Sequence, residues 1–266
     1  MTREPRDGPL HAMDPTGRFS DRAGDYVKYR PDYPAAAIDA VIEGLAPPVL
    51  ATDVGAGTGI SARQLAGRGV CVIAIEPNAP MREAAAPHPL VEWRDGTAEA
   101  TGLATGSVAL VACAQAFHWF RPREALAEFA RVLAPGGRLA LWWNTRDDAD
   151  ALTRGYKDAI RGEGGEHPAE ARDVSSAEFA AEMRLEPRFG GLEALAFPHA
   201  QVLDAEGLLG RATSASYVPR EGPGLEALRA RLEQLHARHA DAGGRVHLRY
   251  VTRVYRLKRL GDTPAH

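Results

Sequence analysis

The sequence predicts an α/β protein built on a doubly wound, mostly parallel β-sheet. Short apolar runs typical of buried strands alternate with amphipathic segments of helical periodicity. A glycine-rich turn follows the first apolar run and opens a helical segment, as in folds of this class. Right-handed helical crossovers make the strands of such an alternation parallel. With 266 residues, the chain is long enough for one such domain with a lid over it.

The first half of the chain supplies the alternating elements. The predicted helices are Ala35–Gly44, Ser61–Arg68, Pro80–Ala86 and one that begins at Pro122. The predicted strands are Val49–Val54, Val70–Ile75, Val91–Arg94, Val108–Cys113 and Arg138–Trp143. The apolar run at 70–75, rich in β-branched residues, is typical of a parallel strand buried on both faces. Because Cys71 and Cys113 lie in such runs, we expect both to be inert buried thiols.

The alternation changes after Asn144. The stretch 147–188 is polar, charged and helical in places, and we interpret it as an inserted helical cap. Beyond it, Leu192–Phe197 is a candidate strand. Leucines three and four residues apart predict an amphipathic helix over Gly224–His239. Alternating apolar residues predict a last strand over Val246–Leu257.

The composition is that of an ordinary globular protein, with 45% hydrophobic and 25% charged residues. Its 32 basic and 35 acidic residues leave a net charge of −3, whereas proteins that bind a phosphate backbone usually carry a basic excess. We therefore expect no nucleic-acid partner. No apolar run reaches the ~18–20 residues of a membrane span. Residues 1–18 are polar and without the apolar region of a signal peptide, so we expect a disordered leader on a cytoplasmic protein.

The residues most informative about function follow the first two predicted strands. A glycine-rich turn, Asp53–Gly59, follows the first strand, and its glycines allow the backbone to turn sharply and approach a ligand closely. Glu76 ends the second strand about 20 residues later, where an acid can accept both hydroxyl hydrogens of a ribose. Because open α/β sheets bind ligands at the carboxyl ends of their strands, this pair predicts a nucleoside cofactor.

The same glycines can also be aligned with the dinucleotide fingerprint G-x-G-x-x-G/A. Two observations oppose that interpretation. Asp53 places a negative charge near the helix N-terminus, where a pyrophosphate would bind, and an ammonium group suits that acid better. The chain also contains no Tyr-x-x-x-Lys pair, a common catalytic device of dinucleotide enzymes. A cofactor that ends in a cationic amino acid is therefore favoured.

Several motifs in register make the segment 19–144 resemble class I S-adenosylmethionine-dependent methyltransferases. Their order and spacing match the small-molecule branch that includes the ubiquinone, menaquinone and trans-aconitate enzymes. The matching segments are Tyr29–Pro34, Asp53–Gly59, Glu76, Gly96–Glu99, Ala114–Phe120 and Ala134–Gly137. The resemblance implies a seven-stranded, Rossmann-like methyltransferase domain over residues 19–266, with the cap inserted at about 147–188.

The resemblance also implies which residues hold S-adenosylmethionine. They are Arg30, Asp53, Gly55, Gly57, Glu76, Pro77, Thr97, Ala98, Ala114 and Gln115. The two glycines would contact the methionine part through their backbone, with Asp53 near its ammonium group and Arg30 paired with its carboxylate. Pro77 would lie against adenine and the Ala98 N–H would bond to its ring. The last two residues would close over the methionine chain.

Thr97 departs from the family pattern. Many relatives carry Asp at this position, where the side chain meets the adenine amino group. A hydroxyl can accept the same hydrogen bond, though less strongly than a carboxylate. Asp95 is the alternative if the alignment shifts.

His118 is the candidate catalytic residue, because the ordinary pKa of histidine suits a general base near neutral pH. A packing role in a His-Trp pair is the alternative. The aromatic residues Trp119, Phe120, Trp142 and Trp143 either line a substrate pocket at the strand ends or belong to the core. The histidines lack metal-ligand spacing, so no metal site is predicted.

The sequence thus predicts methyl transfer from S-adenosylmethionine, leaving S-adenosylhomocysteine, to an O, N or C nucleophile of a small molecule in a monomer or homodimer. The cap, the aromatic segment 19–33 and the stretch 205–220 are expected to shape the acceptor pocket. Two alternatives stay open. One is a protein of this fold that uses the cofactor structurally, in a cyclisation or other non-methylating reaction. The other is an NAD(P)-dependent oxidoreductase.

Overall fold

A computed structural model describes residues 23–164, 180, 183–184, 186–215, 218 and 221–261. The predicted leader, 1–18, and the part of the predicted cap at 165–179 lie outside the described residues. Within the described ranges, no helix is long and apolar enough to cross a membrane.

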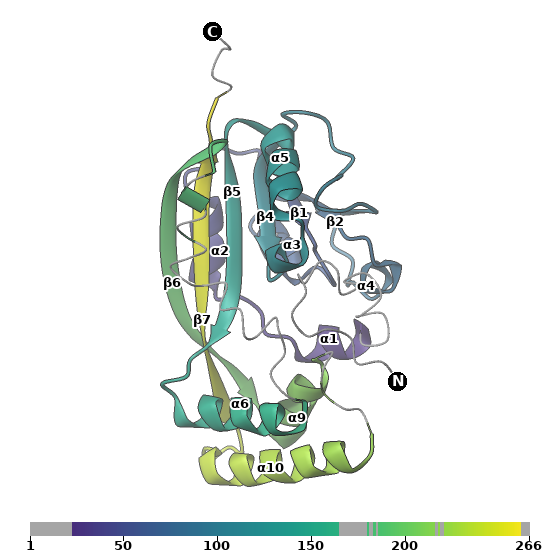
Figure 1. Cartoon of the computed structure of the whole chain (residues 1–266), viewed down its shortest axis with the longest axis vertical. Coiled ribbons are helices and arrows are strands. Elements are labelled where there is room, and N and C mark those ends of the chain that lie inside the picture. Colours follow the sequence, from purple (N-terminus) through teal and green to yellow (C-terminus); the bar gives the residue numbers. More distant parts are fainter. Residues whose placement is uncertain are drawn as a thin grey trace.

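The centre of the molecule is a seven-stranded sheet of order β3-β2-β1-β4-β5-β7-β6 (Figure 1). The strands are β1 (Leu50–Val54), β2 (Cys71–Ile75), β3 (Val91–Arg94), β4 (Val108–Ala114), β5 (Leu133–Arg146), β6 (Phe189–Leu203) and β7 (Val246–Arg259). Strands β3, β2, β1, β4 and β5 pair in parallel, and β7 joins antiparallel between β5 and β6. The predicted fold class, a doubly wound and mostly parallel sheet, is confirmed.

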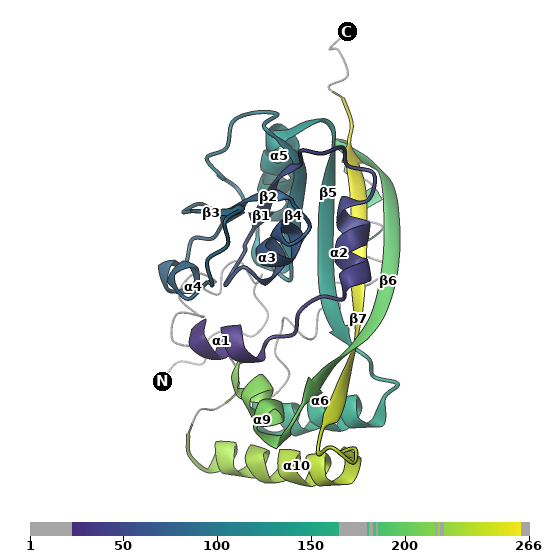
Figure 2. The ribbon, with the colours of Figure 1, turned by 180° about the vertical axis from the view of Figure 1, so that it is seen from behind.

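Helices cover both faces of the sheet and one of its ends. They are α1 (Ala23–Tyr29), α2 (Ala35–Ile42), α3 (Ile60–Ala66), α4 (Ala79–Glu83), α5 (Pro122–Val132), α6 (Ala151–Gly164), α9 (Ala205–Thr213) and α10 (Pro223–His239), with a 3₁₀ turn, η3, at Phe117–Trp119. Helices α2 and α3 lie on one face and α5 on the other (Figures 1 and 2). Helices α6, α9 and α10 lie beyond the ends of β5, β6 and β7 and pack on one another.

Helix positions follow from the spacing of apolar residues. In α5, Pro122 occupies the first turn, where its missing N–H costs nothing, and Phe129 and Val132 are fully buried against the sheet. On the opposite face, Ile38 and Val41 of α2 are fully buried. The central strands are therefore buried on both faces, as parallel strands require.

Three of the sequence predictions need correction. The cysteine at 71 is exposed, because it is the first residue of β2 and only the four that follow are buried; Cys113 is buried as predicted. The fifth strand, predicted over Arg138–Trp143, is longer: β5 begins at Leu133 and includes the segment Ala134–Gly137. Its residues bulge out, since Val108 and Leu110 of β4 pair with Leu133 and Arg138. The candidate strand 192–197 is the middle of a longer strand, β6.

The helical end of the molecule also has a wider origin than the predicted insertion at 147–188. Helix α6 belongs to that insertion, but α9 and α10 come from the connection between β6 and β7. The three helices share one apolar core with the adjoining ends of β6 and β7, which includes Tyr156, Leu208 and Leu232. The cap and the sheet are therefore packed as one body.

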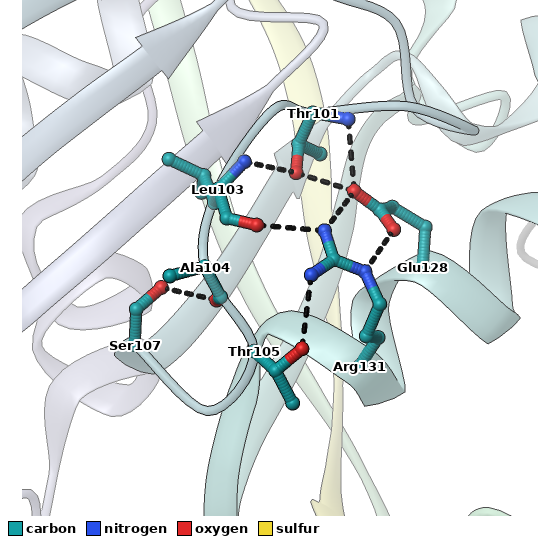
Figure 3. A network of polar contacts seen from close by, with 7 residues as sticks. All are labelled: Thr101, Leu103, Ala104, Thr105, Ser107, Glu128 and Arg131. Carbon is teal, nitrogen blue, oxygen red and sulfur yellow. Dashed lines mark hydrogen bonds and ion pairs between the residues drawn. The ribbon is translucent and has the colours of Figure 1, made fainter.

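A partly buried ion pair, Glu128 with Arg131, fixes the loop that leads into β4 (Figure 3). Glu128 of α5 accepts hydrogen bonds from the N–H and hydroxyl of Thr101 at 2.9 and 2.6 Å. Arg131, one turn later, bonds both oxygens of Glu128 and donates to the carbonyl of Leu103 and the hydroxyl of Thr105. Because buried carboxylates and loop carbonyls need partners, this network holds the loop in one conformation.

Candidate active site

The turn between β1 and α3 is held against the end of β2. The N–H groups of Gly55 and Ala56 both donate to the carbonyl of Ile75, at 2.9 and 3.1 Å. Gly55 has φ +69°, and a Cβ there would lie 2.6 Å from Cβ of Ala116 and 2.9 Å from the Phe120 ring. Glycine is therefore required both for the turn and for the packing of the chain after β4.

Glu76 joins this turn to the next strand. Its Oε2 accepts the N–H of Gly57 at 2.8 Å, and its Oε1 accepts the N–H of Asn78 at 2.9 Å. Asn78 in turn begins α4 by accepting the N–H of Met81. Burial raises the pKa of Glu76, although these two backbone bonds oppose the shift. Each carboxylate oxygen keeps a second lone pair for a ligand.

Asp53 lies beneath the turn and is fully buried. Its Oδ2 accepts the hydroxyl of Ser61 at 2.5 Å, and its Oδ1 has no hydrogen-bond partner. Burial raises its pKa to about 7, and the charge of Glu76 adds to that rise. Any influence of Asp53 on a ligand therefore passes through Ser61, which faces the cavity.

A cavity of about 180 Å³ lies at the carboxyl ends of β1, β2 and β4. Eight of the residues predicted to bind a cofactor line it: Gly55, Gly57, Glu76, Pro77, Thr97, Ala98, Ala114 and Gln115. Further lining residues include Tyr33, Thr58, Ser61, Asn78, Met81, Glu99, Trp119 and Phe120. The site therefore combines five separate segments of the chain at one edge of the sheet, as expected for an open α/β fold.

The charges in this wall are all negative. Glu76 and Glu99 supply its two carboxylates. Among the described residues that line the cavity there is no lysine, arginine or histidine. A pyrophosphate would have no cationic side chain here to pair with, whereas hydroxyl and ammonium donors would meet acceptors.

Gln115 closes the cavity through an unusual backbone conformation. It has φ +55°, the only positive value for a non-glycine residue in the described part of the chain. Its N–H donates to the carbonyl of Trp142 at 2.9 Å, and its side-chain amide reaches the carbonyl of Asn144 at 3.4 Å. A left-handed non-glycine residue costs of order 1–3 kcal/mol and persists only where its surroundings hold it. Such residues are concentrated at functional sites.

Three predicted site residues do not line the cavity. Asp53 lies under it, and Arg30 lies where its charge acts on Tyr156 of the cap. His118 follows β4 in η3, where its Nδ1 accepts the indole N–H of Trp143 at 3.4 Å. A neutral ring then carries its proton on Nε2. The catalytic role of His118 stays a prediction.

The aromatic residues divide between cavity and core. Trp119 and Phe120 line the cavity, whereas Trp142 and Trp143 are buried in the two apolar layers. Tyr33, the last residue of the aromatic segment 19–33, lines the cavity and packs edge-on against Trp142 at 5.7 Å. It lies in the motif Tyr29–Pro34, and this was the signal available for it.

The carboxylate nearest the predicted adenine segment is Glu99. Its backbone neighbours Thr97 and Ala100 bond to each other across a tight turn at 3.2 Å, which points this segment into the cavity. Glu99 accepts the N–H of Arg121 at 2.9 Å. Asp95, the alternative considered from the sequence, is absent from the lining and pairs with Arg82 on the surface.

Comparison with known proteins agrees with this geometry. Residues 52–141 match the family model described as "Methyltransferase domain". An uncharacterized methyltransferase of Mycobacterium tuberculosis is 45% identical over 133 residues, which are 49% of this chain and 53% of that protein. The match thus spans about half the length of that relative. An uncharacterized methyltransferase-like protein of Schizosaccharomyces pombe is 33% identical over 75% of this chain and 78% of its own.

Solved structures share the whole fold. A "Putative Type II Methyltransferase" from Anaeromyxobacter dehalogenans covers 88% of this chain and all of its own, with a TM-score of 0.65 and 26% identity. A phosphoethanolamine N-methyltransferase of Haemonchus contortus, solved with phosphomonomethylethanolamine and S-adenosylhomocysteine, covers 97% of this chain and 61% of its own. Its TM-score is 0.55 and its identity 13%. From the sheet, the cavity and these relatives together, the chain belongs to the class I S-adenosylmethionine-dependent methyltransferase superfamily.

Proposed function

We propose that this chain transfers a methyl group from S-adenosylmethionine to an O, N or C nucleophile of a small molecule. The observation that carries the proposal is the pairing of the glycine turn with Glu76 in a cavity whose described lining has carboxylates and no basic side chain. Such a wall suits ribose hydroxyls and an ammonium group better than a pyrophosphate. The Haemonchus enzyme holds the product of this cofactor in the same fold.

Different residues of the cavity would bind different parts of the cofactor. Glu76 would accept the ribose hydroxyls with its remaining lone pairs. Pro77, Thr97 and Ala98 would hold the adenine ring, with Glu99 as a further acceptor for its amino group. The turn at 55–57 and the pair Ala114 and Gln115 would enclose the methionine part, with Asp53 acting through Ser61 on its ammonium group.

The bound sulfonium would supply an electrophilic methyl carbon. This carbon would accept a lone pair of the acceptor, and the electrons of the carbon–sulfur bond would leave with sulfur. The chain's part is to align the acceptor and to exclude water, which accounts for much of the acceleration in such displacements. Tyr33, Trp119 and Phe120 form the aromatic side of the cavity and are placed for this. A proton on the acceptor would pass to water or to a base such as His118.

The first test is calorimetric titration of the full chain with S-adenosylmethionine and, separately, with NADPH. We expect binding of the first alone. Glu76→Gln should weaken it roughly 10- to 100-fold, the effect of losing hydrogen bonds to a charged group. Glu92→Gln is the matched control, because Glu92 is an exposed acid on β3 paired with Arg94. NADPH binding without S-adenosylmethionine binding would refute the proposal.

The second test follows the methyl group. The protein is incubated with trideuteromethyl-labelled S-adenosylmethionine and mixtures of small molecules, and the products are analysed by mass spectrometry. Gain of the labelled methyl group by a small molecule is the expected result. Conversion of a substrate without that gain would instead support a non-methylating use of the cofactor.

A further inference from the structure

A second group of polar side chains, mostly buried, lies between the cap and the sheet. It consists of Arg146, Tyr156, Arg211, Ser214 and Tyr250, which we call the arginine–tyrosine cluster. Arg146 and Tyr250 are direct cross-strand neighbours at the ends of β5 and β7. Tyr156 comes from α6, and Arg211 and Ser214 come from α9 and the residue that ends it. The cluster therefore joins four elements that are distant in sequence.

Arg211 is a buried charge without a carboxylate partner among the described residues. Its residue is 5% exposed. Its Nε donates to the hydroxyl of Tyr250 at 3.2 Å, and its Nη1 reaches the hydroxyl of Ser214 at 3.5 Å. The groups whose charge acts on it are Tyr250, Tyr156 and Arg146. Buried guanidinium groups are rarely found without an anion, because desolvation of the charge is costly.

Other arginines of the same chain show the usual arrangement. Arg131 pairs with Glu128 beside the loop before β4. Arg256, whose side chain is 11% exposed, bonds to both Glu43 and Glu193. Arg211 is more buried than either of these arginines. Within the described residues, its side chain hydrogen-bonds only to the hydroxyl groups of Tyr250 and Ser214. This difference indicates that its counter-charge comes from outside the described residues.

Tyr156 gives a second, independent sign of a missing acceptor. The residue is fully buried, and within the described part of the chain its hydroxyl has no hydrogen-bond partner. The guanidinium of Arg146 lies 5.2 Å from the centre of its ring. Burial raises the pKa of Tyr156 to about 12, while the charges of Arg211, Arg146 and Arg30 act in the opposite direction. The positive charges of these arginines and an unsatisfied O–H donor thus lie close together around Tyr156.

Strand β5 connects the cavity wall to the arginine–tyrosine cluster. Trp142, Asn144 and Arg146 alternate along this strand and so face the same side of the sheet. Trp142 packs against Tyr33 of the cavity, and the carbonyl of Asn144 accepts the side-chain N–H of Gln115. Figures 1 and 2 show α6 and α9 at the end of β5, with α1 beside α9. Strand β5 thus links the cavity wall to the cluster.

We propose that the arginine–tyrosine cluster binds an oxyanion of the methyl acceptor, a carboxylate or a phosphate. Arg211 supplies the compensating charge and Tyr156 donates its hydroxyl. The assignment of the anion to a methyl acceptor rests on the proposed methyl transfer. Anion binding at the cluster can be measured independently of that activity. The proposed oxyanion site narrows the class of methyl acceptor from any small molecule to an acidic small molecule.

Tyr156→Phe is the most selective variant, because it removes a hydroxyl that has no partner and leaves the ring in place. The control is Tyr255→Phe, which removes the hydroxyl of another buried tyrosine, packed against Trp143 on the other side of the sheet. The full chain is titrated with citrate and with inorganic phosphate at constant ionic strength, with chloride as reference, and followed by thermal unfolding and calorimetry. We expect one of the two anions to bind. Which of them binds shows whether the cluster prefers a carboxylate or a phosphate.

We expect Tyr156→Phe to weaken that binding at least fivefold and Tyr255→Phe to leave it unchanged. Arg211→Met should abolish it and, in anion-free buffer, should unfold no earlier than the unsubstituted chain, because an uncompensated buried charge is removed. Arg256→Met, which removes the shared partner of Glu43 and Glu193, should unfold at a lower temperature than the unsubstituted chain. Equal anion affinity in Tyr156→Phe, or no binding of either anion beyond chloride, would overturn the inference.

Titration with S-adenosylmethionine on the same samples separates the two proposals. Cofactor binding without anion binding refutes only the cluster. Anion binding without cofactor binding refutes methyl transfer, and with it the assignment of the anion to an acceptor. The label-transfer assay is then run on matched pairs of free acids and their neutral amides. We expect the acids to gain the methyl group, with a raised KM and a nearly unchanged kcat in Tyr156→Phe; preference for the amides contradicts the inference.

Discussion

Asp53 shows how one buried side chain couples the cofactor site to stability. The folded protein retains its proton up to about pH 7, because the carboxyl group is fully buried, whereas its ordinary pKa is 3.8. The folded state thus binds more protons than the unfolded state between these values. The unfolding free energy should therefore fall as pH rises through this window, by at most about 4 kcal/mol from this group.

We predict that Asp53→Asn removes most of this pH dependence. The measurement is urea unfolding of the unliganded protein at several pH values between about 4 and about 8. Asp158→Asn is the control, because Asp158 is an exposed residue of α6. If the difference in stability between the Asn variant and the unsubstituted chain is constant across this range, Asp53 does not titrate there.

His118 is the second residue whose role can be decided by substitution. Its ring is absent from the cavity lining and its Nδ1 accepts the Trp143 indole N–H. We therefore expect His118→Ala to leave the S-adenosylmethionine affinity unchanged and to lower turnover by less than the roughly 100-fold that a general base contributes. Turnover is measured by label transfer once an acceptor is known. A loss of 100-fold or more would establish His118 as the base.

At the scale of elements, the contact between α5 and the loop before β4 supports the side of the cavity where we propose that adenine binds. Partial burial acts against ionisation of Glu128, but hydrogen bonds from Arg131 and Thr101 lower its pKa to about 2. A lowered pKa stabilises the folded state above the ordinary value of 4.5, and this contribution is lost as pH falls toward 2. The segment 96–99, which lines the cavity, ends two residues before Thr101.

We predict that Glu128→Gln lowers the unfolding free energy at pH 7 by about 1–2 kcal/mol, the value of charged hydrogen bonds in a partly exposed site. The deficit should shrink below about pH 4, and S-adenosylmethionine binding should weaken by a few fold. Thermal unfolding across pH and calorimetry measure the two effects. Glu124→Gln, an exposed acid on the same helix, serves as control. A deficit that persists undiminished at low pH would show that the ion pair is not its source.

At the scale of the whole molecule, the two cysteines report on the sheet from different depths. Cys71 is exposed at the start of β2, and Cys113 is fully buried in β4, where burial raises its pKa well above the usual value. We predict that a thiol reagent modifies Cys71 readily in the native protein and Cys113 only on unfolding. Peptide mass mapping after timed labelling checks this. Rapid modification of Cys113 would mean that the centre of the sheet opens locally.

Local patterns in the sequence were sufficient to predict the sheet and the glycine turn that lines the cavity. The strand, glycine turn and helix at 50–66 are encoded by neighbouring residues, and Glu76 follows from the end of a second apolar run. Both are short-range features, because strand ends and tight turns depend on backbone conformation within a few residues. For that reason Gly55, Gly57 and Glu76 could be grouped from the sequence, together with Thr97 and Ala98 from a motif in register, and the structure brings all five to one cavity.

The tertiary structure alone decided the positions of side chains that depend on packing between distant segments. Arg30 and His118 lie in the right segments but outside the cavity, since the direction of a side chain is set by what packs on it. The exposure of Cys71 depends on where its strand begins, the least certain feature of any sequence pattern. The arginine–tyrosine cluster could not be foreseen, because no local pattern links residues 146, 156, 211 and 250. Local sequence therefore determined the strand ends and the turn that line the cavity, and long-range packing of the cap determined the arginine–tyrosine cluster.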